Sequence, residues 1–345
     1  MPKTIEKDIT KKEKKQKVIN LKEIVFNSSN LALTLCLVIV CLLFIPTLNR
    51  QWLIYDDRII YENLYFSTPK TFGEIFEILD SFGFKFNLIS SNVIYSSNFV
   101  VRTCPLANVF WLTINFIFQN KDPVLYHSVN LILHLINTCI VFHILKFVLG
   151  NKTNQILIPI LTLLWATHPV IMESVLLTSN SGATFTYMFF FAFLLDFLKN
   201  KDRNTSTLRK TLIPILYLTA MLTNEYIITL PFVLFAISFY KNYKTNPLKM
   251  AITISLKETL PYFTGFVIYL IYFFFFSSYR SNNFSAGSQL IVFTERVFWL
   301  APQIFFHFLT LILYPKILSI DQTLFVKLGK TLFDPYSVFC ILFFF

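Results

Sequence analysis

Two neighbouring carboxylates are the residues of this chain best placed to do acid–base chemistry. Asp56 and Asp57 lie in a polar stretch shortly after the first long apolar segment. A carboxylate at the membrane surface can act as a general base and take the proton of an acceptor hydroxyl. The sequence does not say which of the two is the base, and an ordinary solvated acidic loop is the alternative interpretation.

Arg102 is the candidate cation of the same polar stretch. Its guanidinium offers a planar fork of donors that suits phosphate oxygens. Pro105 follows and predicts that a helix begins there, because proline costs least at the first helical position. An interfacial arginine that faces lipid headgroups is the alternative.

A polar stripe made of His127, Asn130 and His134 lies within an apolar segment. Spacings of three, four and seven place the three residues on one face of a helix. In a membrane helix such a stripe lines a cavity or hydrogen-bonds a neighbouring helix, and both readings stay open. The histidines are seven residues apart and the stripe has no third ligand, so we expect no metal site.

His168, Glu173 and Glu225 stand where apolar segments are interrupted. Irregular backbone at membrane depth is tolerated only where it is buried in protein or lines a wet cavity. These three residues are therefore candidate cavity residues. The alternatives are a polar turn over His168–Ser181 and, for Glu225, a helix-end carboxylate.

The composition shows what kind of protein must position these residues. Of 345 residues, 55% are hydrophobic, 14% are charged, and 41 are phenylalanines. An average soluble domain has about 45–50% apolar and about 25% charged residues, so a soluble fold is excluded. We expect an all-α multi-pass membrane protein. Its net charge of +11 lies in short runs, which indicate topology rather than a nucleic-acid partner.

The apolar segments divide the chain into four parts. Residues 1–30 form a basic cytoplasmic tail, and residues 31–48 form the first transmembrane helix. Residues 49–105 form a long extracytoplasmic loop with a surface helix and the acidic motif. Residues 106–345 form a helical membrane region that looks truncated at its carboxyl end. Its apolar segments are expected at about 106–118, 126–148, 156–172, 183–198, 211–223, 226–240, 260–277, 296–314 and 337–345.

The charges between these segments decide how residues 106–118 are placed. With 13 residues the segment is short for a bilayer, which needs about 20 residues per helix. If it does not cross, the loops 199–210 and 241–257 face the cytoplasm together with the amino terminus. Those two loops hold nine basic residues and one acid, as the positive-inside bias requires. The candidate residues then share the outer face.

The order and spacing of the motifs resemble the membrane region of the protein O-mannosyltransferase-like family whose members carry tetratricopeptide repeats. The matching pieces are Tyr55–Asn63, Arg102 with Pro105, Tyr126–His134, Thr167–Glu173, and Glu225 with Pro231. The resemblance implies a GT-C-type transmembrane bundle. It also implies an inverting transfer of a sugar, most simply mannose, from a dolichyl or undecaprenyl phosphate to a hydroxyl acceptor, with protein serine or threonine as one candidate.

In this scheme Asp56 or Asp57 is the base, and the donor phosphate lies near Arg102, His127 and His134. No cofactor is required, and a divalent cation is allowed but not implied. Two cations of the family pattern are missing, since Asn224 stands where a lysine is usual and residues 180–183 lack an arginine, and the repeats are absent. An inactive membrane scaffold and a transporter of lipid-linked substrate are therefore the alternatives. The membrane is a bacterial inner membrane or the endoplasmic reticulum.

Overall fold

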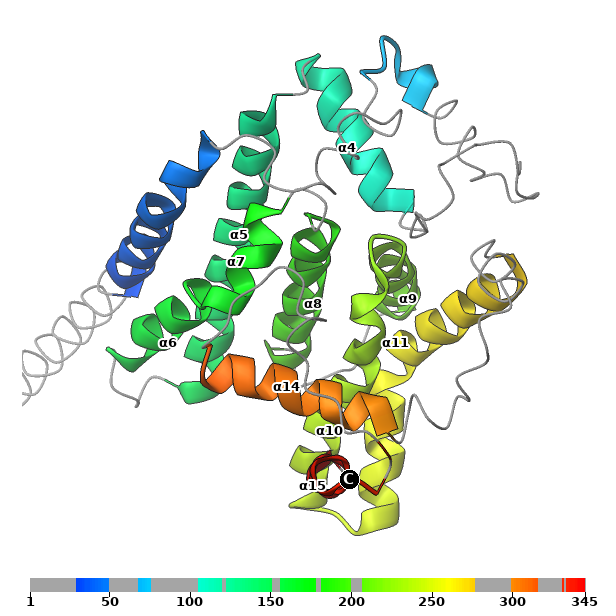
Figure 1. Cartoon of the computed structure of the whole chain (residues 1–345). Helices are drawn as coiled ribbons and strands as arrows, with labels where there is room; N and C mark the ends of the chain where they lie inside the picture. Colours follow the sequence, from blue (N-terminus) through cyan, green and yellow to red (C-terminus); the bar gives the residue numbers. More distant parts are fainter. Residues whose placement is uncertain are drawn as a thin grey trace, which may run out of the picture.

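The computed structural model describes residues 29–49, 68–75, 105–119, 122–150, 156–177, 181–199, 207–276, 299–315, 331 and 333–344. Every regular element in these ranges is a helix (Figure 1). The chain begins its described part with the helix Ser29–Leu48, here called the first helix. It continues with α4 (Pro105–Phe118), α5 (Pro123–Leu149), α6 (Leu157–Ala166), α7 (Pro169–Leu176), α8 (Ser181–Lys199), α9 (Thr207–Met221), the 3-10 helix η3 (Glu225–Thr229), α10 (Leu230–Tyr243), α11 (Leu248–Phe276), α14 (Ala301–Leu313) and α15 (Pro335–Phe344).

Three of the described helices are long and apolar enough to cross a membrane. They are the first helix, α5 and the part of α8 from Gly182 to Lys199. The pair α6 and α7 passes the same test when it is taken as one span, which is bent by 49°. The chain is therefore an all-α membrane protein.

Contacts between the helices fix the directions in which they run. The first helix is antiparallel to α5, because Lys146 at the end of α5 bonds Ser29 while Phe44 packs on His134. The pair α6 and α7 returns along α5, and α8 then runs in the same direction as α5 (Figure 1). α9 is antiparallel to α8, and α10 and α11 form an antiparallel pair.

The bundle therefore has two distinct ends. The upper end, as drawn in Figure 1, is where α5 and α8 begin and α9 ends; the lower end is where α5, α8 and α10 end. α4 stays at the upper end: its Leu106 N–H donates to Leu222 O after α9, and its Asn115 accepts from Tyr126 near the start of α5. The short segment expected at 106–118 thus does not run from one end of the bundle to the other.

One expected element is different in the structure. The apolar run expected at 156–172 is two helices, and the polar turn expected over His168–Ser181 is helical from Pro169 to Leu176. Pro169 has no N–H to continue α6, but its fixed backbone angle suits the first turn of a new helix. The chain therefore bends at His168 and continues as a helix.

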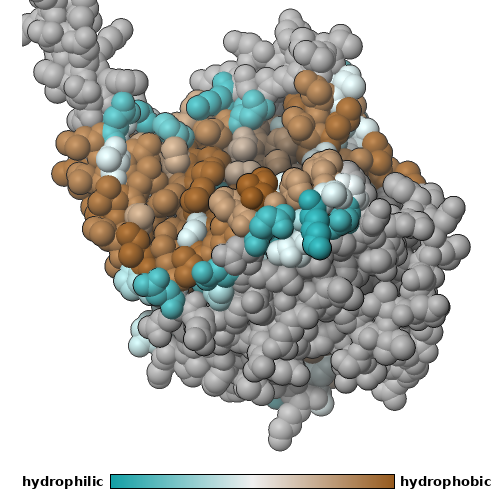
Figure 2. Space-filling view, turned by 90° about the horizontal axis from the view of Figure 1, so that it is seen from above, coloured by the Kyte–Doolittle hydropathy of each residue, from teal (hydrophilic) through white to brown (hydrophobic). Residues whose placement is uncertain are grey.

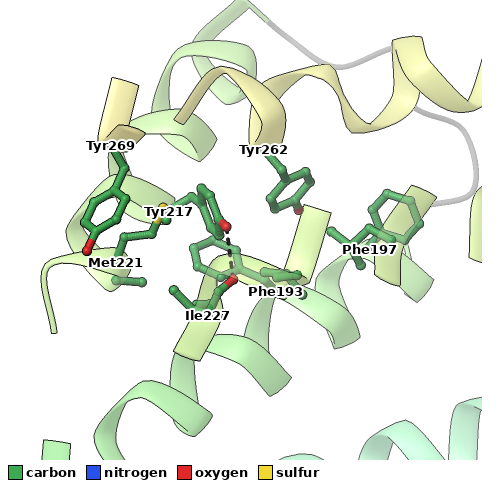
Figure 3. Close-up of a cluster of buried hydrophobic side chains, with 10 residues drawn as sticks. Phe193, Phe197, Tyr217, Met221, Ile227, Tyr262 and Tyr269 are labelled. Carbon is green, nitrogen blue, oxygen red and sulfur yellow. Dashed lines mark hydrogen bonds between the residues drawn. The ribbon is translucent and has the colours of Figure 1, made fainter. Parts of the chain in front are cut away.

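The half of the bundle built from α8 to α11 has an aromatic core. Tyr217 lies at its centre, between Phe193 and Tyr262, with ring centroids 6.1 Å and 6.0 Å away (Figure 3). The Tyr217 hydroxyl donates to Ile227 O over 3.0 Å. A Cβ on Gly265 would lie 2.8 Å from the Tyr217 ring, so α9 and α11 approach each other closely only because residue 265 is glycine.

The described helices expose many large apolar side chains, as expected of helices in lipid. Figure 2 looks down on the upper end, where hydrophobic residues cover much of the coloured area. The first helix exposes Leu31, Leu35 and Leu42 by 53–63%, and α11 exposes Leu260 by 60%. In water such patches would favour aggregation, whereas in a bilayer they face acyl chains.

Candidate functional site

The start of α5 sets the position of the predicted histidine stripe. Asp122 precedes the helix, and its side chain accepts a hydrogen bond of 2.9 Å from the N–H of Val124. Pro123 occupies the first helical position, where no N–H is needed. The first turns of α5 therefore lie at the upper end and carry His127 and Asn130.

The polar stripe faces protein rather than lipid. His127, Asn130 and His134 are each exposed by 2% or less, whereas Ile132 and Ile136 on another face of α5 are exposed by 56% and 39%. Polar groups at membrane depth are costly unless they are paired inside the protein. The stripe is therefore the inner face of α5.

His134 holds the end of α6. Its Nε2 donates to the carbonyl of Ala166 over 2.9 Å, and its ring lies 5.3 Å from that of Phe44 and 5.7 Å from that of Trp165. Ala166 is the last residue of α6, and the last carbonyls of a helix have no partner within it. His134 thus satisfies a backbone group that the bend would leave unpaired.

Asn130 does the same for the end of α7. Its side-chain NH₂ donates to Val175 O and Leu177 O over 3.3 Å and 3.4 Å. One further polar residue, Asn137, lies three positions after His134 and donates to Thr184 O of α8 over 2.9 Å. The sequence reasoning missed Asn137, although its spacing continues the same stripe.

The two asparagines each keep one unused acceptor. The Oδ1 atoms of Asn130 and Asn137 are buried and have no hydrogen-bond partner within the ranges that the structure describes. Buried polar atoms are nearly always paired in folded proteins. The stripe can therefore accept further donors at these two atoms.

Next to the stripe, Tyr126 ties α4 to α5. It is fully buried, its hydroxyl donates to the Asn115 side chain, and its ring stacks on Trp111 with centroids 4.7 Å apart. Sequence reasoning did not single out Asn115. A polar residue in so apolar a helix was the available signal.

α4 also carries part of the predicted extracytoplasmic loop. Gln119 at the end of α4 donates to Pro69 O over 2.8 Å, and Ile75 packs on Leu112 in a small buried cluster. Residues 72–75 are helical, where the amphipathic pattern predicted a surface helix. The loop therefore returns to the upper end of the bundle about a dozen residues after the acidic pair.

His168 lies at the bend between α6 and α7. Its Nδ1 accepts from the N–H of Val170 over 3.3 Å, and its Nε2 donates to the carbonyl of Ile312 in α14 over 2.9 Å. A neutral ring with the proton on Nε2 satisfies both bonds. His168 thus connects the bend to α14.

Near Glu225 the backbone of three elements comes together at the upper end. Asn224 caps η3 by accepting from the N–H of Tyr226 over 3.2 Å, and the hydroxyls of Thr186 and Thr223 lie 2.7 Å apart. A Cβ on Gly182 would lie 3.7 Å from Thr223 O, so the start of α8 passes close to η3. Glu225 is the first residue of η3.

The remaining predicted site residues lie outside what the structure describes. This holds for Asp56, Asp57 and Arg102, and for the side chains of Glu173, within α7, and Glu225. Among the described side chains, no group of three histidine, cysteine, aspartate or glutamate residues is arranged to hold a metal ion. The structure thus brings His127, Asn130 and His134 together on α5 and places His168 separately, at the bend.

Comparison with known proteins finds a distant relative. Human protein O-mannosyl-transferase TMTC3 is 26% identical over 115 residues, which are 33% of this chain and 12% of that protein. No family model and no solved structure matches the chain. The match supports a loose relation to TMTC3, and this chain aligns with only a small part of its length.

Proposed function

We propose that the chain is a membrane glycosyltransferase that moves a sugar, most simply mannose, from a polyprenyl phosphate to a hydroxyl acceptor at the upper, extracytoplasmic end. The observation that carries the proposal is the similarity to human protein O-mannosyl-transferase TMTC3. The order of the sequence motifs supports the same reading. The buried polar stripe of α5 supports it further. Ionisable residues inside a membrane helix usually face the protein interior and mark a functional region.

In this proposal one of Asp56 and Asp57 is the general base. The acceptor oxygen attacks the anomeric carbon while its proton passes to the carboxylate. The bond between that carbon and the phosphate oxygen breaks, the electron pair leaves with the polyprenyl phosphate, and the configuration is inverted. The protonated aspartate then returns its proton to water.

Charge builds up on the departing phosphate, and donors aimed at it lower the barrier. We assign Arg102 and His127 to this task, since His127 is the stripe residue nearest the start of α5. Asn130 and His134 already donate to backbone carbonyls, so they act by holding α6 and α7 in place. Glu173, Glu225 and His168 remain proposed cavity residues, and a divalent cation is allowed without being required.

The test is sugar transfer by the purified full chain in lipid nanodiscs. Radiolabelled mannose on a synthetic polyprenyl phosphate is offered with a serine- and threonine-containing peptide. The double variant Asp56→Asn with Asp57→Asn should lose about 10²–10⁴-fold in rate, which is the usual contribution of a general base. The matched control is Asp122→Asn, which removes an exposed carboxylate and keeps a good helix cap.

The outcomes separate this proposal from its alternatives. Transfer by the double variant at more than about a tenth of the wild-type rate would rule out the base assignment. If the wild-type protein moves the labelled lipid between leaflets without cleaving it, the chain is a transporter. If it does neither, the missing cations have left an inactive scaffold.

A further inference from the structure

Three basic side chains gather at the lower end of the bundle, opposite the candidate site. Lys146 lies in the last turn of α5 and Lys199 is the last residue of α8. Because α5 and α8 run in the same direction, both lysines reach the same end. His143 lies one turn before Lys146, and both lysines act on its ring electrostatically.

The first helix adds a hydroxyl to this group. Lys146 Nζ donates to the Oγ of Ser29, the first residue of that helix, over 2.7 Å. The bond joins two helices that start and end at the same level. Ser29, His143 and Lys146 are half-buried, while Lys199 is exposed. The group is thus partly sheltered by protein and open on one side.

Basic side chains predominate in this group. Lys146, Lys199 and His143 come from the ends of two parallel helices, and both lysines lie close enough to His143 to act on it. The nearest acid along α8 is Asp196, one turn before Lys199. Elsewhere, Glu258 accepts from Ser238 over 2.5 Å between α10 and α11. Lysines grouped at one end of the bundle favour a bound anion, which would relieve the repulsion between them.

The apolar surface around the cluster favours a lipid headgroup as the source of that anion. The adjoining first helix exposes Leu31 by 61% and Leu35 by 53%, and α5 exposes Val148 by 61%. These side chains face acyl chains in a bilayer, and charged residues at the ends of spans lie at headgroup depth. An anion at this position therefore has an acyl-chain surface directly beside it.

We propose that Ser29, His143, Lys146 and Lys199 bind the phosphate of an anionic phospholipid, whose acyl chains lie along the first helix. The two ammonium groups and the hydroxyl supply hydrogen-bond donors for the phosphate oxygens. The site is separate from the proposed sugar-transfer site and does not depend on that activity. Lipid bound here would fasten the first helix to α5 and α8.

The test is lipid binding by the full chain in detergent, read by native mass spectrometry and by the thermal unfolding midpoint. The ligands are phosphatidylglycerol, phosphatidylcholine and inorganic phosphate. A lysine that contacts the phosphate of a bound anionic lipid contributes about fivefold in affinity, so Lys146→Gln with Lys199→Gln should weaken phosphatidylglycerol binding about 30-fold. The control is Lys241→Gln with Lys249→Gln, which removes the same charge from exposed lysines on α10 and α11. That control should weaken phosphatidylglycerol binding by less than about threefold.

Three results would overturn the proposal. Equal losses in the two double variants would show a general charge effect rather than a site. Phosphatidylcholine binding as tightly as phosphatidylglycerol would remove the need for an anion. Stabilisation by inorganic phosphate at the same concentration would show a phosphate site without a lipid. If the double variant fails to fold, Lys199→Gln alone should weaken binding about fivefold, because its exposed side chain has little structural role.

Discussion

The two halves of the bundle hold their helices together in different ways. Around α5, polar side chains donate to the backbone of neighbouring helices, as His134 does to Ala166 and Asn130 to Val175. Between α9 and α11, aromatic rings pack around Tyr217, and Gly265 lets the helices come close (Figure 3). In this half, Tyr217 donates to Ile227 O, and Ser238 of α10 donates to Glu258 of α11.

The difference follows from the backbone that each half must accommodate. The span α6–α7 is bent by 49°, and a bend exposes carbonyls that lipid cannot satisfy. The inner face of α5 supplies the missing donors. α10 and α11 are each one helix without a break, so packing and a few bonds between side chains can hold them together, as is usual between membrane helices. The main structural role of the polar stripe on α5 is thus to satisfy carbonyls at the ends of α6 and α7.

The largest effect is expected when the aromatic core loses its central ring. Tyr217→Ala should lower the free energy of unfolding by about 3–5 kcal/mol, because it empties a fully buried position. Tyr217→Phe keeps the ring and loses only the bond to Ile227 O, so it should cost about 1 kcal/mol. Denaturant titration in mixed micelles measures both. Equal losses would show that the hydroxyl, and not packing, holds this half.

A smaller effect is expected from closing the gap between α9 and α11. Gly265→Ala places a methyl group 2.8 Å from the Tyr217 ring and 3.0 Å from Pro214 O, and should cost about 1–3 kcal/mol. Gly73→Ala is the matched control, because its Cβ meets its nearest atom at 3.9 Å. Wild-type stability in Gly265→Ala would mean that the helices are not in close contact.

In the α5 half, the loss of stability on replacing His134 should depend on whether the new side chain can donate a hydrogen bond, and less on its volume. His134→Leu fills the site but leaves Ala166 O without its partner, at a cost of about 1–3 kcal/mol. His134→Gln keeps an N–H donor and should recover part of that loss. The same unfolding titration compares them. If Leu is tolerated better than Gln, the position is governed by packing, and the contrast between the halves fails.

The smallest effects separate two members of the stripe. Asn130 donates to carbonyls at and beyond the end of α7, which have no partner within the helix. Asn137 donates to Thr184 O, which lies inside α8, where carbonyls also accept the bonds of the helix itself. Asn130→Ala should therefore cost about 1 kcal/mol, and Asn137→Ala about 0.6 kcal/mol, the average for interhelical bonds in membranes. Hydrogen exchange at α7 should rise in Asn130→Ala only. A rise in both variants would remove the distinction.

The sequence predicted the helices of this fold well, since apolar runs and basic loops depend on local composition. The prediction that residues 106–118 do not cross followed from the short length of this segment and from the charges of the later loops. The bend at His168 could be anticipated only as an interruption, because Pro169 both stops one helix and starts another. The partner of His134 could not be predicted, since nothing in the spacing says that Ala166 lies opposite. Asp56 and Asp57 as catalytic residues stay a prediction from their motif.

The central claim is that the candidate residues lie at one membrane face and the lysines at the ends of α8 and α10 lie at the other. Cysteine labelling of sealed vesicles tests it most directly, with single cysteines at Lys70→Cys and Lys244→Cys and a tag at the amino terminus. Both positions are exposed, at the upper and lower ends. Cys104, which lies just before Pro105, is replaced by serine in both variants, and the other four cysteines are buried or partly buried. A membrane-impermeant maleimide should then reach Lys70→Cys on the side opposite the tag. It should reach Lys244→Cys only on the side of the tag, and labelling of both positions from one side would contradict the account.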